Sequence, residues 1–349
     1  MINKTNKNQN LISLLGINKF LFIIAILYLF YILEGDVLDN FGLSSIIPLT
    51  FYINDGKLNP WFVTGFSDAE CSFIIRIRKN LKYKTDWSIE LRFQIGLHKK
   101  DKLLLEKLQS YFGVGLIKIQ TKDSLQFIVQ SIKDLEIIIN HFDKYPLITQ
   151  KSSDYLLFRQ AFQLVKNKKH LDKEGIQNLV AIKAVFNKGL PDYLKAAFPE
   201  ILPYDRPLVY NIIIQDPYWV SGFVSGDGCF NIRFVKNSKS ESVNLSFLVT
   251  QHDRDAKLLN SLVEYFQCGR YRVRSSRLLH SDYVVTKFDD IKCKIVPFFD
   301  KYPLQGEKYL DFLDFKKIML LKGNSYVSLT KEMLAEIKQI KSGMNKGRK

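Results

Sequence analysis

The chain of 349 residues is 46% hydrophobic and carries a formal net charge of +16, so it can form one large or two modest globular domains. Its four cysteines form no C-x-x-C pair and its five histidines form no H-x-x-x-H cluster, which argues against a zinc site and a disulfide framework. The charge favours a polyanionic partner, and a merely soluble basic protein is the alternative.

Residues 1–57 form a hydrophobic leader whose charges cancel, so all of the net charge lies in residues 58–349. The uncharged run FLFIIAILYLFYIL at 20–33, with the apolar residues before it, approaches the length of a membrane span but is interrupted by Lys19. A transit peptide would be rich in Arg, whereas the leader has none and contains four acids. We expect the leader to lie outside the functional body, and a membrane anchor is the alternative that is not favoured.

The remainder of the chain is an internal repeat. Four blocks recur in the same order, at offsets of 154 to 158 residues. The matched blocks are 65–73 with 222–230, 91–115 with 245–269, 141–147 with 298–304, and 171–189 with 329–347. They predict two like domains, 58–189 and 215–349, the second ending in a basic tail. The linker at 190–214 is rich in proline, so it can hold neither one continuous helix nor a central strand.

The same order of elements is predicted in each domain. Asn59 and Asp216 are N-cap residues followed by Pro, so a helix is expected to begin after each. Period-two alternation then predicts strands with an apolar back and a polar front. The next apolar blocks have helical spacing and are predicted to end at Gly113 and Gly269. Two further strands and more helices complete an α+β domain with one sheet face covered and the other open.

The doubled motif predicts how the two domains meet. Gly65 and Gly222 each have a small residue four positions later, a spacing that lets two helix backbones approach closely. If these helices pack together, Glu70 and Asp227 become neighbours at helix C-termini, which is unfavourable unless a cation lies between them. A lone acid in such a place is usually part of a turn, but its recurrence in both copies favours catalysis. Mg²⁺ held beside a basic polar sheet is suited to phosphodiester hydrolysis.

The motifs WFVTGFSDAECSF at 61–73 and YWVSGFVSGDGCF at 218–230 resemble the two signature motifs of the LAGLIDADG homing endonucleases, in the single-chain form of organellar group I introns. The resemblance covers residues 58–347. It implies pseudo-symmetric αββαββα repeats with two four-stranded antiparallel sheets that form a saddle over double-stranded DNA. It also implies a double-strand break at a long asymmetric site, which promotes intron homing. Glu70 and Asp227 would bind the metal ions, Mg²⁺ or Mn²⁺, that cut the strands.

The same resemblance suggests further site residues. Lys151 and Lys308 match a basic residue that the family places near the scissile phosphates, and an ordinary solvated helix lysine is the alternative. Gln251 matches a glutamine that orders active-site water, but its counterpart is Leu97, so we expect unequal halves. Cys71 stands where the motif has Gly. We expect a left-handed helix end there, where Cys would cost about 1 kcal/mol and shift the neighbouring acid.

The polar fronts of the predicted sheets are the expected DNA-reading surface, because two-stranded ribbons fit the major groove and Arg prefers guanine. The candidate residues are Ser72, Arg76, Arg78, Arg92, Gln94, Asn231, Arg233, Asn244, Ser246, Arg270, Arg272 and Arg274.

Two other functions compete with the nuclease. A maturase that binds its own intron RNA and assists splicing would suit the charge and the polar sheets equally well, although intact acids in both motifs favour a nuclease. A membrane protein would rest on the leader alone. The abundance of Lys, Asn, Ile, Phe and Tyr indicates an AT-rich organellar gene. We therefore expect a monomer with two pseudo-symmetric halves in the mitochondrial matrix.

Overall fold

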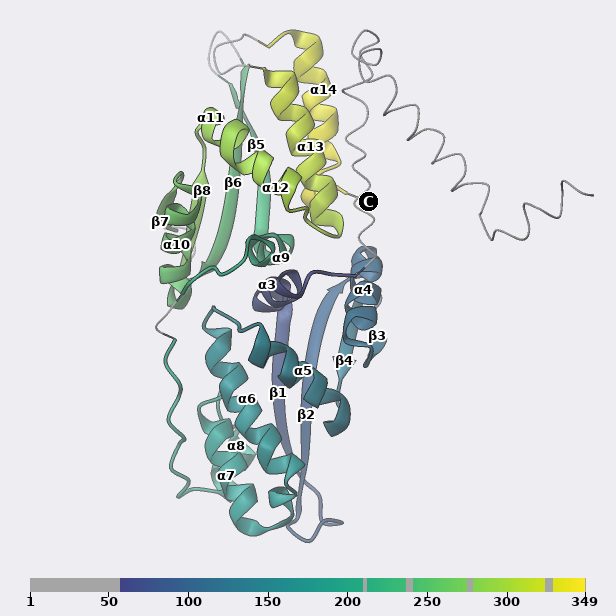
Figure 1. The fold of residues 1–349 in the computed structure, drawn as a ribbon, viewed down its shortest axis with the longest axis vertical. Coiled ribbons are helices and arrows are strands. Elements are labelled where there is room, and N and C mark those ends of the chain that lie inside the picture. Colours follow the sequence, from purple (N-terminus) through teal and green to yellow (C-terminus); the bar gives the residue numbers. More distant parts are fainter. Residues whose placement is uncertain (1–56, 210–211, 237–240, 275–278, 324–328, 349) are drawn as a thin grey trace, which may run out of the picture. The chain divides into compact units, whose positions relative to one another are not determined.

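Each motif helix leads directly into the first strand of a sheet (Figure 1). In the first half, α3 (Pro60–Glu70) is followed by β1 (Cys71–Lys79) and β2 (Trp87–His98). In the second half, α9 (Pro217–Asp227) is followed by β5 (Gly228–Lys236) and β6 (Glu241–His252). The side chains of Asn59 and Asp216 cap the two helices, as predicted, by accepting hydrogen bonds from the backbone N–H groups two residues later.

The structure, a computed structural model, describes residues 57–209, 212–236, 241–274, 279–323 and 329–348. The predicted leader, including its hydrophobic run at 20–33, therefore lies outside the described residues except for Lys57. Across the described ranges, no helix is both long and apolar enough to cross a membrane.

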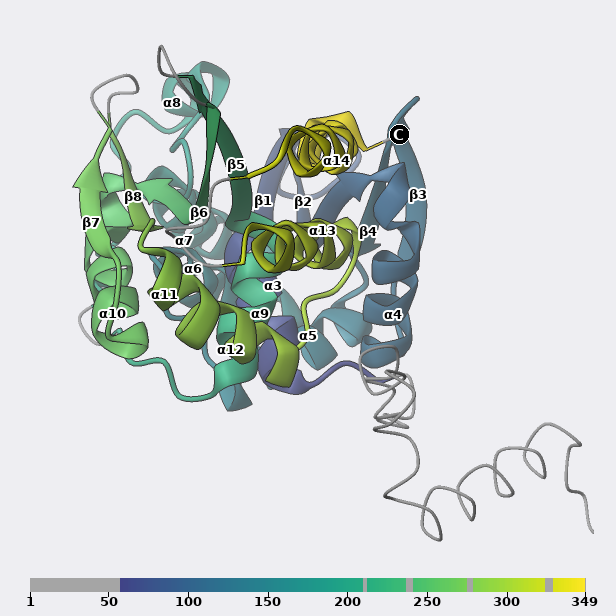
Figure 2. The same cartoon turned by 90° about the horizontal axis from the view of Figure 1, so that it is seen from above.

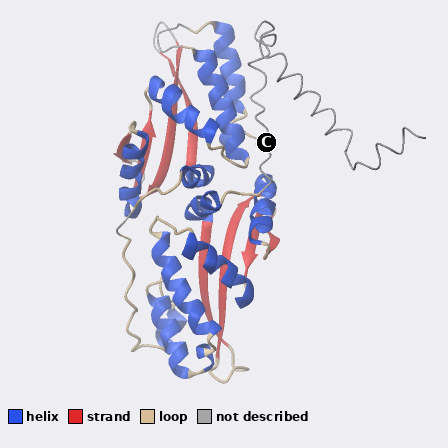
Figure 3. Ribbon diagram, viewed as in Figure 1, coloured by secondary structure: helices blue, strands red, loops and turns tan. Residues whose placement is uncertain are grey.

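The strands form two four-stranded antiparallel sheets with the same strand order. Figure 3 shows their strands in red and the helices that pack on them in blue. In the first half, β3 (Leu116–Thr121) and β4 (Ser124–Val129) complete the order β1-β2-β4-β3. In the second half, β7 (Arg270–Val273) and β8 (His280–Val285) complete the order β5-β6-β8-β7. The expected α+β fold with two like sheets is confirmed.

Helices cover one face of each sheet, because their apolar sides pack onto the apolar backs of the strands. In the first half α4 (Lys102–Phe112), α5 (Ile132–Lys144) and α6 (Lys151–Lys166) contact the strands, and α7 (Lys173–Ala184) packs against α6. The short helix α8 (Asp192–Ala197) and the 3₁₀ turns η3 (Lys99–Asp101) and η4 (Lys169–Leu171) complete this half. In the second half α10 (Ala256–Phe266), α13 (Glu307–Lys322) and the π turn η6 (Ile291–Ile295) contact the strands, and α14 (Lys331–Ser342) packs against α13. The short helices α11 (Phe288–Asp290) and α12 (Val296–Lys301) flank η6, and 3₁₀ turns lie at η5 (Asp253–Asp255) and η7 (Asn345–Gly347). Figure 2 shows α10 lying along β7 and β8, which it contacts.

One predicted helix end is wrong. The helix α4 is followed by Gly113 with φ of 69°, as expected. Its counterpart α10 ends at Phe266, and the left-handed residue is Gln267 with φ of 49°, two residues before the predicted Gly269. Gly269 is instead equivalent to Gly115, and both have positive φ where the backbone lies close against the sheet. The two helices therefore end at equivalent positions of the repeat, whether or not the left-handed residue there is a glycine.

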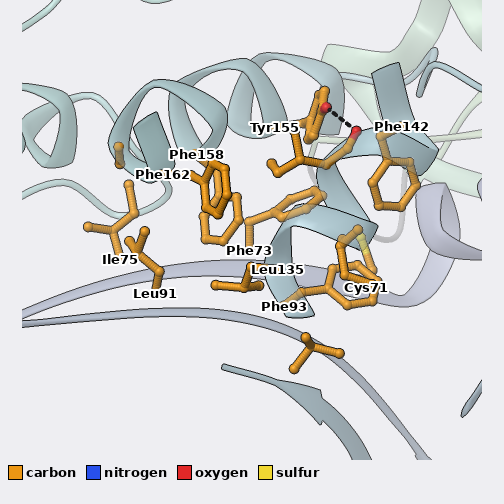
Figure 4. Close-up of a cluster of buried hydrophobic side chains, with 14 of the residues drawn as sticks. Cys71, Phe73, Ile75, Leu91, Phe93, Leu135, Phe142, Tyr155, Phe158 and Phe162 are labelled. Atoms are coloured by element: carbon orange, nitrogen blue, oxygen red, sulfur yellow. Dashed lines mark hydrogen bonds between the residues drawn. The ribbon is translucent and has the colours of Figure 1, made fainter. Parts of the chain in front are cut away.

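The core of the first half is an aromatic cluster between the sheet and the helices α5 and α6 (Figure 4). The ring of Phe73 lies 5.5 Å from that of Phe93, 5.7 Å from that of Phe142 and 5.1 Å from that of Phe158. Phe230 occupies the equivalent place in the second half, with its own ring of phenylalanine neighbours. Each fully buried Phe contributes about 1.5 to 3 kcal/mol relative to an exposed one, so these cores hold the strands that follow the motif helices in place.

Candidate active site and nucleic-acid interface

The seam between the two halves is the close contact of α3 with α9, which lie side by side in Figure 1. A Cβ at Gly65 would lie 1.9 Å from the carbonyl oxygen of Trp219, and one at Gly222 would lie 2.1 Å from that of Phe62. The obstructing atoms belong to the backbone and cannot move aside, so only glycine fits at either position. The predicted packing of the two motif helices is thus confirmed.

The aromatic residues at the start of each motif helix cross this seam. Trp61 of α3 packs against the core of the second half, and Tyr218 of α9 packs against the core of the first half. Ile148, in the loop before α6, is likewise buried in the second core. Apolar burial therefore holds the two helices at a fixed distance and rotation.

Glu70 and Asp227 are the last residues of α3 and α9, and the chain enters β1 and β5 without a loop. The expectation of a left-handed helix end is wrong, because Cys71 and Gly228, which follow the acids, have φ of −78° and −75°. Such extended backbone suits any residue, so Cys71 is not strained. Its side chain is 3% exposed and belongs to the first core. The cysteine therefore gives no reason to expect a displaced Glu70.

The two acids are half-buried carboxyl groups, and the charge of Asp227 acts on Glu70. Burial, followed by the charge of Asp227, raises the pKa of Glu70 to about 7, against the opposing charges of Lys151 and Lys308. Burial also raises the pKa of Asp227, although a hydrogen bond from Gln251 and the charges of both lysines oppose that rise. Raised pKa values at two helix C-termini describe a site that favours a cation or a proton over two bare negative charges.

Lys151 and Lys308 reach the same helix ends from the N-terminal turns of α6 and α13. The Nζ atom of Lys151 donates hydrogen bonds to the carbonyl oxygens of Ser67 (3.0 Å) and Ala69 (3.1 Å). The Nζ atom of Lys308 donates to the carbonyl oxygen of Gly228 at 2.5 Å. Both side chains are half-buried and bonded to the motif backbone, which differs from the solvated helix lysine considered as the alternative.

The two acids do not have the same neighbours. The Nε2 atom of Gln251 donates to Oδ2 of Asp227 at 2.6 Å, which fixes the orientation of that carboxylate. The position equivalent to Gln251 is Leu97, whose side chain cannot form a hydrogen bond to Glu70. The expected inequality of the two halves is therefore present in the geometry.

A further difference is Asp68, which sequence reasoning passed over. Its buried carboxylate accepts hydrogen bonds from the indole Nε1 of Trp219 (2.9 Å), the N–H of Ile148 (3.0 Å) and the hydroxyl of Thr149 (2.6 Å). Burial raises the pKa of Asp68 to about 6 despite these bonds. Its counterpart is Ser225, so only the first motif ties α3 to both α9 and the loop before α6 by a carboxylate.

The donor set around the acids fits a hard divalent ion. Among the described residues, no three His, Cys, Asp or Glu side chains come together as a metal cage. Glu70 and Asp227, with the carbonyl oxygens at the helix ends, offer a small number of oxygen donors. Mg²⁺ is commonly bound by one or two carboxylates plus substrate phosphates while it keeps several waters. A cleft of about 930 Å³ beside Glu70 and Lys308 leaves space for such a phosphate.

On the first sheet, two predicted DNA-reading arginines already have a partner. Arg76 lies opposite Glu90 in the strand register and binds it at 3.0 Å, and Arg92 binds the same carboxylate at 2.5 Å. Burial alone would raise the pKa of Glu90, but the hydrogen bonds from both arginines outweigh it and lower that pKa. These guanidinium groups are therefore held in place and are partly neutralised.

On the second sheet, Asp282 has the corresponding role. Its fully buried carboxylate binds Arg272 at 2.6 Å and Arg274 at 2.7 Å, and it accepts a hydrogen bond from the hydroxyl of Thr250. Burial would raise the pKa of Asp282, but the bonds from the two arginines and the threonine lower it. The acids Glu90 and Asp282 thus orient two arginines each on the polar faces.

The other candidate DNA-reading residues lie on the strands with exposed or half-buried side chains. They are Ser72, Arg78, Gln94, Asn231, Arg233, Asn244, Ser246 and Arg270. The Nδ2 atom of Asn231 donates to Oγ of Ser246 at 3.3 Å, and Arg233 lies opposite Asn244 in the register. A polar face that carries several fixed donors and acceptors can form hydrogen bonds to base edges.

Sequence reasoning also missed Asp101 and Asp255, which lie at the seam. Both occupy the last position of an H-x-x-D pattern in the repeated blocks 91–115 and 245–269. The recurrence of this acid was the one available signal, because its partners lie far away in the chain.

Both halves of the chain match the same known protein family. A sequence model of the LAGLIDADG endonuclease family matches residues 63–162 and again residues 220–319. The chain is similar to two curated proteins of Neurospora crassa. "Probable intron-encoded endonuclease 2" is 40% identical over 82% of the chain and 65% of the relative, and "Probable intron-encoded endonuclease 3" is 41% identical over 77% and 51%. The chain thus spans about two thirds and half of their lengths.

Among solved structures, the chain is similar to the LAGLIDADG homing endonuclease I-SmaMI bound to cleaved DNA. The identity is 46% and the TM-score is 0.82, over 84% of this chain and 99% of that one. I-SmaMI has also been solved on an uncleaved DNA target in the presence of calcium ions.

Proposed function

Because the chain belongs to the LAGLIDADG endonuclease family, we propose that it is a homing endonuclease that makes a double-strand break at a long asymmetric DNA site. The observation that carries this proposal is the meeting of Glu70 and Asp227 at the end of the α3–α9 seam. Each acid is accompanied by a lysine that reaches the same helix end, Lys151 beside Glu70 and Lys308 beside Asp227. Two equivalent acid and lysine pairs match the two strands of a duplex.

The proposed cofactor is Mg²⁺, for which Mn²⁺ can substitute, held by Glu70 and Asp227. An ion bound there would supply an activated water as nucleophile and would neutralise charge on the leaving oxygen. The raised pKa of both acids means that a cation displaces protons when it binds, so the affinity for the ion rises with pH. The calcium-containing complex of I-SmaMI supports divalent ions in general, and the choice of Mg²⁺ rests on the small set of oxygen donors.

The side chains of this protein have distinct roles in the proposal. Glu70 and Asp227 would hold the ions, and Gln251 orients the carboxylate of Asp227 through its hydrogen bond of 2.6 Å. In the DNA complex the ammonium groups of Lys151 and Lys308 would lie beside the scissile phosphates, where fixed positive charge stabilises the transition state.

The polar sheet faces supply binding and sequence discrimination. The excess of Lys and Arg gives a salt-dependent affinity for the phosphate backbone of double-stranded DNA. Arg233 and its neighbours on β5 and β6 read base edges, while Arg76 and Arg272 act in the orientation that Glu90 and Asp282 impose.

The proposed partner is one DNA duplex per protein monomer, with each pseudo-symmetric half bound to one half of the site. The relatives named intron-encoded endonucleases, together with the abundance of Lys, Asn, Ile, Phe and Tyr, support an organellar intron as the gene's location and the mitochondrial matrix as the site of action. A maturase role on intron RNA is not favoured, since the named relatives and the similar solved structures are endonucleases.

The test uses a plasmid that carries the joined exon sequence of the intron's insertion site. We expect the full chain to convert the supercoiled plasmid to the linear form with Mg²⁺ or Mn²⁺ and to leave it intact with EDTA. A matched plasmid in which the intron interrupts the site should not be cut. Cleavage that persists in EDTA would refute the metal site, and an intact joined-exon plasmid would refute the proposed function.

A further inference from the structure

Asp101 and Asp255 are N-cap residues whose side chains do not cap their own helices. They precede α4 and α10, and at neither position does the carboxylate bond to an N–H of the helix that follows. The side chains of His98 and His252 instead cap the 3₁₀ turns η3 and η5 that lead into these helices. The two carboxylates are directed elsewhere.

Each carboxylate crosses the seam to the opposite half. The Oδ1 atom of Asp101, in the first half, accepts a hydrogen bond from the backbone N–H of Glu307 at 2.8 Å. The Oδ1 atom of Asp255, in the second half, accepts one from the backbone N–H of Gln150 at 2.7 Å. Both acceptors lie at the N-terminus of a sixteen-residue helix, α13 or α6, where the helix dipole favours a negative charge.

The anchored residue immediately precedes the site lysine in both halves. Gln150 is followed by Lys151, and Glu307 is followed by Lys308. The backbone of each lysine is therefore fixed from the other half of the protein, one residue away from its Cα. A fixed backbone at this point determines where the long side chain meets the end of the motif helix.

The local backbone is shaped for these contacts. Gly306, just before Glu307, has φ of 67°, and a Cβ at that position would lie 2.3 Å from Oδ1 of Asp101. Glycine is thus required for the approach of the carboxylate as well as for the positive φ. At the equivalent place in the first half, the hydroxyl of Thr149 accepts a hydrogen bond from the N–H of Lys151 at 3.1 Å.

We propose that Asp101 and Asp255 are reciprocal positioning residues, so that each half of the protein places the active-site lysine of the other half. Asp255 acts through Lys151, and Asp101 acts through Lys308. This inference rests on the proposed endonuclease function. It makes the two halves interdependent in cleavage, because neither half alone holds its lysine in place.

A double-mutant cycle on single-turnover nicking of each DNA strand tests the proposal. We expect Asp255→Ala to slow nicking by about 10- to 100-fold, the cost of misplacing a reacting group by about 1 Å. Combined with Lys151→Ala, it should add almost no further loss, whereas combined with Lys308→Ala the losses should multiply. Asp101→Ala should show the opposite pattern. It should slow nicking little further when Lys308 is already Ala, and its loss of rate should multiply with that of Lys151→Ala. The two single variants should also shift the ratio of nicks between the strands in opposite directions.

Controls separate positioning from a general loss of stability. Asp255→Asn keeps an acceptor oxygen and should restore most of the rate. Lys107→Ala removes another contact across the seam, from Lys107 Nζ to the side chain of Gln305 at 2.7 Å, and should leave the strand ratio unchanged. Asp101 is less buried than Asp255, so Asp101→Ala supplies the same test if Asp255→Ala does not fold.

The proposal is overturned if the loss from each Asp variant multiplies equally with both lysine variants, or if both variants slow the two strands alike in proportion to lost stability. Amide hydrogen exchange on the DNA-free protein gives an independent readout. Exchange of the Gln150 amide should accelerate in Asp255→Ala and not in Asp101→Ala. Exchange of the Glu307 amide should accelerate in Asp101→Ala and not in Asp255→Ala. A wild-type protein that does not cut DNA would refute the proposed function, and the exchange result would still decide whether the anchors exist.

Discussion

Replacement of Glu70 with Gln should stabilise the metal-free protein at alkaline pH, although it removes a proposed catalytic residue. The pKa of Glu70 is raised from its ordinary value of 4.5 to about 7, chiefly by burial. One pKa unit corresponds to about 1.4 kcal/mol, so the ionised side chain costs the folded state on the order of 3 kcal/mol above pH 7.

The direction of the pH dependence follows from the raised pKa. Because the folded-state pKa lies above that of the unfolded chain, the contribution of Glu70 to stability is fully present below pH 4.5 and is lost as the pH rises to about 7. Gln does not ionise and escapes this loss. We therefore expect Glu70→Gln to exceed the wild type by on the order of 3 kcal/mol at pH 8.5 and to differ little at pH 4.5.

The assay is urea unfolding followed by circular dichroism, in EDTA, at both pH values. Glu200→Gln, at an exposed loop position, is the matched control and should change stability little at either pH. Addition of Mg²⁺ at pH 8.5 should reduce the difference in unfolding free energy between Glu70→Gln and the wild type, since a bound cation favours the ionised form of Glu70. The reasoning is refuted if Glu70→Gln is no more stable than the wild type at pH 8.5, or if it is stabilised equally at both pH values.

Three further predictions concern the seam, the reading face and the leader. Gly222→Ala places a Cβ 2.1 Å from a backbone oxygen and should cost at least about 1 to 3 kcal/mol in urea unfolding. Gly343→Ala, whose Cβ would lie 3.5 Å from its nearest neighbouring atom, should be tolerated, and equal losses would contradict the close approach of the helices. Arg233→Ala should relax the preference at one or two base pairs and cost about 1 to 3 kcal/mol in binding to the target, and an equal loss on random DNA would identify a phosphate contact instead. A protein that begins at Leu58 should be soluble, monomeric and as active as the full chain, and a loss of cleavage with folding intact by circular dichroism would show that residues 1–57 belong to the enzyme.

The repeat and its periodicity sufficed to predict the sheets and the seam, because both depend on local patterns. Alternation along 87–97 places Leu91, Phe93 and Ile95 on the buried back of the sheet, as the structure confirms. The small residues that follow Gly65 and Gly222 at helical spacing gave the contact of α3 with α9. Patterns of this kind need only the geometry of one helix or one strand.

The pairings between distant residues could not be predicted, since no local pattern encodes them. Asp101 binds the backbone of a residue more than two hundred positions later, and the repeat showed only that this acid recurs. The partnership of Arg272 and Arg274 with Asp282 depends on the register of β7 against β8, which periodicity does not determine. The prediction of a left-handed residue at Cys71 was wrong because α3 is followed directly by β1. Cys71 therefore already has the extended backbone of a strand.

In the proposed mechanism, Glu70 and Asp227 together form one metal-dependent site that cuts both strands. The most direct measurement compares Glu70→Gln and Asp227→Asn with the wild type on the joined-exon plasmid in Mg²⁺, with DNA binding followed in parallel by gel shift. We predict that both variants lose double-strand cleavage while they bind the target as well as the wild type or better, since each change removes a metal ligand and lessens repulsion of phosphate. Wild-type turnover in either variant would contradict the two-acid site.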